Sequence, residues 1–151
     1  GLLSRFSYAF KQPEGSAYPP ILQLNHIEGP VKIDGAGGQI EFTPFEVAHG
    51  QITALGFRIG PVAYLPDVSA MPPAAWEALA GIDCWILDAL RRDPHPSHSH
   101  LAQSIEWIDQ SNVARAVLTN MHNDLDYATL QVELPKHILP AFDGMVLSYD
   151  L

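Results

Sequence analysis

Three short apolar stretches in this chain are each followed by a histidine or an aspartate, and this repetition constrains the fold more than any other feature. The polar residues concerned are His49, Asp67 and His122. Pro66 ends the stretch before Asp67, because proline has no N–H to donate to a sheet. The carboxyl ends of strands are where α/β folds usually build sites, so we expect the three side chains to converge there in a cleft. Imidazole and carboxylate are groups that hold zinc, manganese or iron.

Taken singly, each of these residues has an ordinary structural explanation. An aspartate after a strand, such as Asp67, is commonly a turn residue or the cap of the next helix. A histidine in the same place is commonly a polar residue at the rim of the sheet. The recurrence at one strand position is what favours a metal site over these alternatives.

The composition is that of one globular domain, which we expect to comprise residues 1–151. Hydrophobic residues make up 47% of the chain, enough for a core. A formal net charge of −9 argues against broad binding to nucleic acid or to anionic membranes. No apolar run approaches the ~18 residues of a membrane span. The lone cysteine, Cys84, cannot form an internal disulfide, which favours the cytoplasm, and its apolar surroundings favour a buried, inert thiol.

The pattern of apolar residues changes after Asp67. Before this point the pattern predicts mainly strands, and after it strands alternate with helices. This order predicts a mixed sheet with helices on at least one face, in the α/β (α+β) class. The expected strands are 21–27, 31–33, 41–48, 53–59, 62–65, 82–87 and 113–118, with further strands around Asp143-Gly144 within 138–149. The expected helices are 72–81, 99–110 and 126–133. The glycine-containing loop 34–38 is predicted to connect a hairpin and not to bind phosphate.

The first 20 residues carry several large apolar side chains. Leu3, Phe6 and Phe10 fall near one helical face, and Tyr8 adds to the apolar surface. Two outcomes are open: the segment packs onto its own domain, or it forms a lip over a cleft or a contact between copies. Because exposed apolar surface and free sheet edges favour self-association, we expect a homo-oligomer.

Residues 95–100 (HPSHSH) hold three histidines just before an expected helix. The ordinary explanation is a solvated loop in which Ser97 or Ser99 caps the helix. The alternative is that a histidine of this segment faces the site, and His98 is the strongest candidate.

With these segments in view, the sequence resembles the metallo-β-lactamase-fold hydrolases. The most similar branch is that of the phosphodiesterases linked to phosphonate breakdown, which are related to the tRNA 3′-processing nucleases. The similar segments cover most of the chain after residue 40 in the family's order, and together they are specific. They are 45–50 (FEVAHG), 55–60 (LGFRIG), 64–69 (YLPDVS), 87–91 (LDALR), 95–98 (HPSH), 118–127 (LTNMHNDLDY) and 141–145 (AFDGM).

This resemblance implies a metallo-β-lactamase-like αββα sandwich with a dinuclear site for two zinc or manganese ions. His49 would be a metal ligand and Asp67 the carboxylate that bridges the ions. His98 would be the catalytic histidine, acting as general acid or as hydrogen-bond donor to a phosphoryl oxygen. Two such ions lower the pKa of the attacking water and stabilise the attacking and leaving oxygens. The implied substrate is a small phosphodiester.

Two departures from the family pattern affect these expectations. The last ligand is normally a histidine directly after Leu-Thr, where this chain has Asn120. Residues two apart on a strand share a face, so His122 is the expected ligand and Asn120 the alternative. Asp124 or Asp126 could orient the ligand histidines, or both could be ordinary surface acids.

The second departure is the absence of the family's first signature, His-x-His-x-Asp-His. We therefore expect the chain to be the C-terminal portion of such an enzyme, with an incomplete sandwich. By itself it should bind metal weakly or not at all, and it should be inactive. The leading interpretation is a metal-dependent phosphodiester hydrolase in the whole protein. Two alternatives are a metal-free interaction or scaffold domain on the same fold, and a thioester or lactone hydrolase, since fold does not fix substrate.

Overall fold

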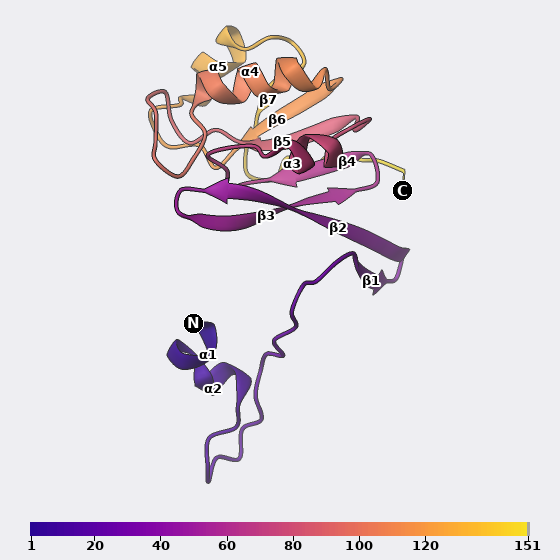
Figure 1. The fold of residues 1–151 in the computed structure, drawn as a ribbon, viewed down its shortest axis with the longest axis vertical. Helices are drawn as coiled ribbons and strands as arrows, with labels where there is room; N and C mark the ends of the chain where they lie inside the picture. Colours follow the sequence, from indigo (N-terminus) through magenta and orange to yellow (C-terminus); the bar gives the residue numbers. More distant parts are fainter. Residues whose placement is uncertain (151) are drawn as a thin grey trace.

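The computed structural model describes residues 1–150 and gathers their strands into one mixed sheet (Figure 1). The strands lie side by side in chain order from β1 to β7. They are β1 (Val31–Gly35), β2 (Gly38–His49), β3 (Ile52–Ile59), β4 (Val62–Leu65), β5 (Cys84–Asp88), β6 (Arg115–Thr119) and β7 (Ile138–Pro140). The predicted α/β class is confirmed, and residues 1–150 form one sheet instead of the two stacked sheets of a whole sandwich.

The direction of the strands brings four strand ends to one edge of the sheet. Strands β1 to β4 pair antiparallel, whereas β4 to β7 pair parallel. Parallel neighbours need crossover connections, which here contain helices α3 (Pro73–Ala78), α4 (Leu101–Ser111) and α5 (Tyr127–Glu133). Because β2 and β4 run in the same direction, the carboxyl end of β2 lies at the same edge as the ends of β4, β5 and β6.

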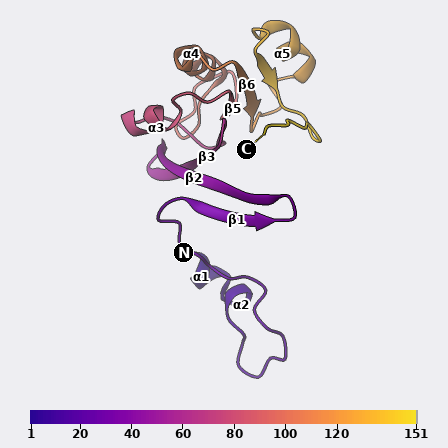
Figure 2. The same cartoon turned by 90° about the vertical axis from the view of Figure 1, so that its right-hand side faces the viewer.

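The core lies between the parallel strands and the helices that connect them (Figures 1 and 2). Strand β5 contributes Trp85 and Leu87, both without solvent exposure, and α4 contributes the equally buried Ile108. Such near-continuous burial explains why β5 reads as an unbroken apolar run. The Trp85 ring meets that of Trp76 from α3 edge to face, with 6.1 Å between centroids.

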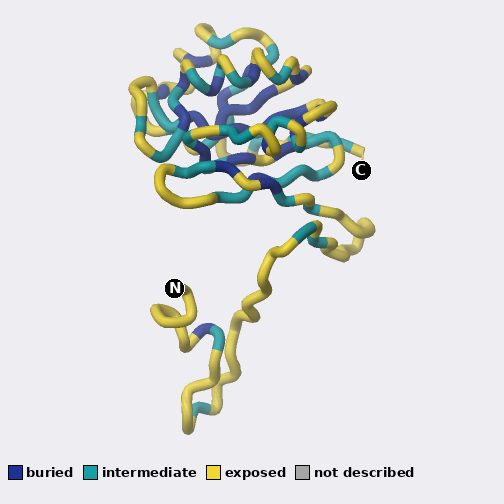
Figure 3. Tube along the Cα trace, in the orientation of Figure 1, coloured by how far each residue is buried: buried dark blue, intermediate teal, exposed yellow. Residues whose placement is uncertain are grey.

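Residues 1–30, the N-terminal arm, extend away from the sheet (Figures 1 and 3). The arm contains two four-residue helices, α1 (Leu2–Arg5) and α2 (Ser7–Phe10). Only Ala9 is buried in this part of the described chain. The exposed large apolar side chains are Leu2, Leu3, Phe6, Tyr8, Tyr18, Ile21, Leu22, Leu24 and Ile27. In this structure the arm does not pack onto the sheet. The first of the two expected outcomes, packing onto its own domain, is therefore not observed.

One strand prediction is wrong, and another holds only in part. Residues 21–27 form no strand, because their alternating side chains have no neighbouring strand to pair with in the described chain. At the other end, 138–149 forms β7 and then the expected turn at 143–144, where Gly144 has a φ of +88°, but no strand follows the turn. The predicted hairpin at 34–38 is confirmed, with Gly35 opposite Gly38. None of the helices in residues 1–150 combines the length and hydrophobicity that crossing a bilayer requires.

Candidate metal centre

Three side chains from different parts of the sheet edge come together as a possible metal site. His49 is the last residue of β2, Asp67 follows β4, and His98 lies between β5 and α4. Each offers one ligand atom, and these atoms lie within 4.8 Å of one another. Two of the three expected ligands, His49 and Asp67, are thus neighbours, and the third member of the cluster is the expected catalytic histidine.

Backbone pairing fastens the Asp67 loop to the end of β2. Ser69 N–H donates to the carbonyl of Ala48 at 2.8 Å, and Ala48 N–H donates to the carbonyl of Ala70 at 3.1 Å. Gly50 N–H also donates to the Ser69 hydroxyl at 2.9 Å. These bonds hold the loop that carries Asp67 beside His49, so the cluster does not depend on side-chain contacts alone.

The tautomer of His49 follows from its partner. Its Nδ1 lies 2.6 Å from the carbonyl oxygen of Ser97. A carbonyl only accepts, so Nδ1 donates and the lone pair of the neutral ring is on Nε2. Gly50 makes this approach possible: its φ is +62°, and a Cβ there would lie 3.0 Å from the Ser97 side chain. The ring of His49 is therefore oriented by the loop that also carries His98.

His98 is held in the same way by a buried carboxylate. Its Nδ1 lies 2.8 Å from Oδ2 of Asp88, to which it donates, and 3.8 Å from Oδ1 of Asp67. Its ring meets that of His49 edge to face, with 4.6 Å between centroids. A carboxylate that fixes a histidine from behind is the usual support of metal-binding or catalytic imidazoles.

Asp88 holds His98 in the structure, a role that the sequence analysis did not assign to it. Its side chain is fully buried at the end of β5, and that burial raises the pKa of its carboxyl. Hydrogen bonds from His98, Val68 N–H and Asn120 oppose this rise. The signal was present, since Asp88 follows an apolar strand as Asp67 does.

The loop before α4 is anchored to the backbone of Asp88. The hydroxyls of Ser99 and Ser104, both fully buried, each donate to the carbonyl of Asp88 at 2.7 Å. Ser99 therefore does not cap α4, whose N-cap is His100 without a side-chain bond. The loop that carries His98 is fixed to the strand that carries Asp88.

The structure does not bring His122 into the cluster. Strand β6 ends at Thr119, and the next residue, Asn120, has a left-handed φ of +60°. The strand periodicity on which the His122 assignment rested stops there. The His122 side chain is 60% exposed, and its Nδ1 lies 3.2 Å from Asp124. Asp126, one of the two acids that could have oriented a ligand histidine, caps α5 by accepting a hydrogen bond from the N–H of Thr129.

His95 lies at the margin of the cluster. Its ring centroid is 5.3 Å from that of His98, and its Nδ1 accepts from Ser97 N–H at 3.3 Å. Desolvation, followed by the charge of Arg91, lowers the pKa of His95. It remains in the loop as a neighbour of the cluster and not a member of it.

The donor set of the cluster fits a divalent ion. Two imidazoles and one carboxylate are what zinc, manganese or iron accept, and the bonds at Nδ1 of both histidines leave their Nε2 atoms free. In residues 1–150 no second group of this kind occurs. The chain's own residues thus suit one ion, and a second ion would find few ligands among them.

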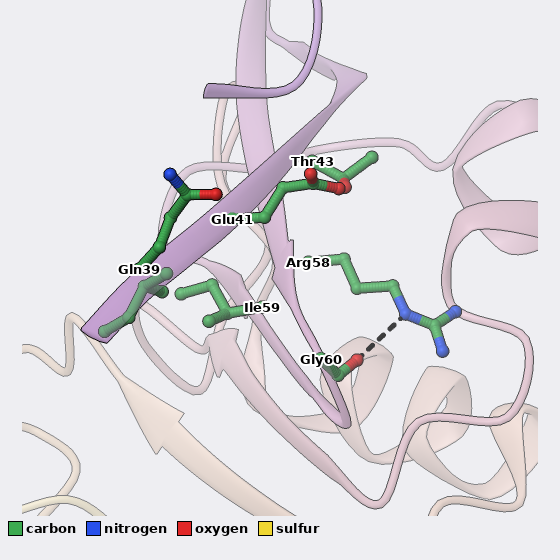
Figure 4. Close-up of a pocket in the computed structure, with 7 residues that line it drawn as sticks. Gln39, Glu41, Thr43, Arg58, Ile59 and Gly60 are labelled. Carbon is green, nitrogen blue, oxygen red and sulfur yellow. Dashed lines mark hydrogen bonds between the residues drawn. The ribbon is translucent and has the colours of Figure 1, made fainter. Parts of the chain in front are cut away.

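A groove lies at the opposite end of β2 from His49. It has a volume of about 540 Å³ along β2 and β3, and Arg58 lines it (Figure 4). The guanidinium of Arg58 donates to the carbonyls of Gly60, Ala78 and Ala80, at 2.8 to 3.1 Å. It therefore fastens the end of α3 to β3, and the groove contains no comparable set of metal-binding groups.

The sequence of this chain is similar to those of known proteins. A family model described as the β-lactamase superfamily domain matches residues 1–121. An octanoyltransferase of Porphyromonas gingivalis (strain ATCC BAA-308 / W83) is 30% identical over 146 residues, which are 93% of this chain and 28% of that protein. The chain thus spans little more than a quarter of the curated relative that it matches.

Solved structures give the same fold. A diphosphatase of the PhnP family matches with a TM-score of 0.83 and 31% identity, over 99% of this chain and 55% of its own. Human tRNase Z, short form, matches with a TM-score of 0.57 and 19% identity, over 74% of this chain and 44% of its own. Zinc-bound PqqB from Methylobacterium extorquens matches with a TM-score of 0.59 and 16% identity, over 82% and 55%. The last two show similarity of fold alone.

Proposed function

Because the chain belongs to the β-lactamase superfamily, we propose that it carries part of the metal centre of a phosphodiester hydrolase. The superfamily and the structural neighbours support a hydrolase in the whole protein. The observation that carries the proposal is the cluster of His49, Asp67 and His98, whose ligand atoms lie within 4.8 Å. The 31% identical diphosphatase supports phosphoryl chemistry, since the match covers 99% of this chain.

In this proposal His49 and Asp67 hold the ion and His98 serves the substrate. The free Nε2 of His49 and the half-exposed carboxylate of Asp67 are the available ligands. A divalent cation, when bound there, supplies Lewis acidity to the phosphoryl group and to the attacking water. Since Asp88 accepts the Nδ1 proton of His98, Nε2 is left to exchange a proton or a hydrogen bond with a phosphoryl or leaving-group oxygen.

The remaining ligands of the site belong, in this proposal, to the part of the enzyme that the chain does not span. A catalytic zinc or manganese takes about three protein ligands. Two ligands and a nearby histidine would leave an ion largely hydrated, so this chain alone should bind metal weakly and turn over no substrate. The partners we propose are a small phosphodiester and further copies of the chain. The buried free thiol of Cys84 supports a cytoplasmic location.

The name of the curated relative gives a specific reason to keep acyl chemistry as the second candidate. It is an octanoyltransferase, and a thioester or lactone hydrolase on the same fold would also act at an acyl carbon. The match covers only 28% of that protein, so its name describes a much longer chain. A metal-free scaffold domain is the third candidate, and the gathering of three metal-binding groups at one place argues against it.

The deciding experiment is an assay of the full-length protein on matched phosphodiester, thioester and lactone substrates with added zinc or manganese. We expect metal-dependent turnover of phosphodiesters. Turnover of thioesters alone would make thioesters, and not phosphodiesters, the substrate class. No metal-dependent turnover of any substrate would favour the metal-free scaffold domain.

The roles of the two histidines can be separated by metal binding. In the full-length protein, zinc calorimetry should show that His49→Gln weakens zinc binding more than His98→Gln does. Both substitutions should remove activity. Equal losses of zinc affinity would make His98 a ligand. Two tight zinc sites in the 151-residue chain would contradict the ligand count.

A further inference from the structure

Asn120 occupies an unusual place at the edge of the candidate metal centre. It is the first residue after β6, and its backbone is left-handed, with φ +60°. Asparagine tolerates this conformation better than most residues with a side chain. The chain turns away from the sheet here, and the side chain is left between the loops that follow β4 and β5.

The amide nitrogen of Asn120 reaches two acceptors from these neighbouring strands. Its Nδ2 lies 3.3 Å from the carbonyl oxygen of Pro66 and 3.2 Å from Oδ1 of Asp88. Only the nitrogen suits this position, since an amide oxygen would face two other oxygens. The two N–H groups are thereby used. The 3.4 Å approach of Nδ2 to Nδ1 of His98 is then a contact between two donors and not a hydrogen bond.

Each acceptor is tied directly to a member of the cluster. Pro66 immediately precedes Asp67 in the chain. Asp88 accepts from Nδ1 of His98 and, at 3.3 Å, from the N–H of Val68, the residue after Asp67. The side chain that directly follows β6 therefore bonds to the residue before Asp67. It also bonds to the carboxylate that holds both His98 and the residue after Asp67.

We propose that Asn120 is a positioning residue that fixes Asp67 and His98 relative to each other, and that it is not itself a metal ligand. Without its amide, Oδ1 of the buried Asp88 loses the donor seen here, and the Pro66 carbonyl loses its tie to β6. Leaving a buried acceptor without a partner is costly, so the carboxylate and the loop should both shift or loosen. The inference rests on the proposed function for its metal readout, but its first readout needs no metal.

The test uses two substitutions of Asn120 and one matched control substitution elsewhere in the chain. Asn120→Gly removes the amide and keeps a backbone suited to positive φ. Asn120→Asp keeps the shape and replaces the donor by an acceptor. Asn112→Gly is the control, because Asn112 is also left-handed, with φ +54°, and follows α4 away from the cluster. All three are made in the full 151-residue chain and compared by thermal unfolding, hydrogen exchange and zinc calorimetry.

We expect both Asn120 variants to lower the exchange protection of the Val68 amide by about tenfold without metal, because its acceptor Asp88 is no longer fixed. Zinc affinity should fall by roughly 10–100-fold, as is typical when a residue supporting a metal ligand is lost. The Asn112→Gly control should leave both quantities unchanged, and its melting temperature should fall less than that of Asn120→Gly, because it leaves no buried carboxylate without a donor.

The outcomes separate this inference from the proposed function. Unchanged Val68 protection in both Asn120 variants would overturn the positioning role. Tighter zinc binding by Asn120→Asp would overturn it too, because it would make this position a ligand position. If the wild-type chain shows no zinc binding even at millimolar concentration but Val68 protection still falls, the positioning role stands, whereas an absence of zinc binding by the full-length protein would contradict the metal proposal.

Discussion

The N-terminal arm and the sheet contain the same kinds of apolar side chains, but only the sheet buries them. In the arm, Tyr18 is 82% and Ile21 77% exposed, whereas Leu65 and Leu87 in the sheet are 0% exposed. The contrast is visible along the whole trace in Figure 3. It shows that hydrophobic composition alone does not make a core: side chains are buried only where strands and helices provide opposing surfaces.

The candidate metal centre lies wholly in the sheet region of the molecule and not in the arm. His49, Asp67 and His98 are carried by elements that pair with one another, and Asp88 and Asn120 connect those elements further. No residue of the arm contributes to the cluster. The sheet should therefore govern chemistry and stability, whereas the arm should govern association.

The largest effect should come from the carboxylate of the cluster. In the full-length enzyme, Asp67→Ala should reduce turnover by about 10³-fold or more, because a charged metal ligand is lost. Tyr18→Ser in the arm should leave turnover of each active site unchanged. Steady-state kinetics with circular dichroism as a check on folding measures both. An Asp67→Ala enzyme that keeps a tenth of its activity with metal bound would remove Asp67 from the site.

The next largest effect should come from a substitution in the core, which lowers the free energy of unfolding. Leu87→Ala removes a fully buried side chain from β5 and should lower the free energy of unfolding by about 2–5 kcal/mol. Leu22→Ala in the arm, the same chemical change at an exposed position, should alter it by less than about 0.5 kcal/mol. Urea unfolding of the two variants measures the difference. Similar losses at both positions would mean that the arm is buried in solution.

Association should depend on the arm. We expect the chain to form dimers or larger assemblies, and the double change Phe6→Ser with Tyr8→Ser should shift it towards monomers. Val132→Ser on α5 is the control, because Val132 is 87% exposed yet lies outside the arm. Sedimentation velocity at several concentrations measures the distribution. A chain that stays monomeric at all concentrations would refute self-association through this surface.

The smallest effect on the melting temperature should come from Asp126, which caps α5 in the sheet region of the molecule. Hydrogen bonds from the side chain and N–H of Thr129 hold the pKa of Asp126 below its ordinary value. A lowered folded-state pKa stabilises the fold above the ordinary value, and this contribution is lost as pH falls through the folded-state pKa. Asp126→Ala should therefore lower the melting temperature slightly at pH 7, and the difference should shrink in acid.

The matched control for the cap is Glu14→Ala, which removes an exposed acid from the arm. It should leave the melting temperature unchanged at neutral pH. If the difference between Asp126→Ala and the wild type stayed constant down to pH 2, the Thr129 bonds would not be its source.

Several strand predictions succeeded because their signals were local. Apolar runs such as 82–87 and 113–118 gave β5 and β6 within two residues, since a strand covered by helices must be apolar along its length. The prediction for 21–27 failed because an alternating pattern becomes a strand only beside a partner. The hairpin at 34–38 succeeded because its turn and its partner strands are adjacent in the chain.

By itself, the sequence determined the α/β class, the strand ends that carry His49 and Asp67, and the superfamily resemblance. These depend on short-range patterns and on residue types at fixed spacing. Only the tertiary structure decided which polar groups meet. The left-handed turn at Asn120 leaves His122 exposed beside Asp124, and the buried Asp88 reaches across to hold His98. Such contacts join residues 10 to 54 positions apart, and their geometry depends on packing that no local pattern records.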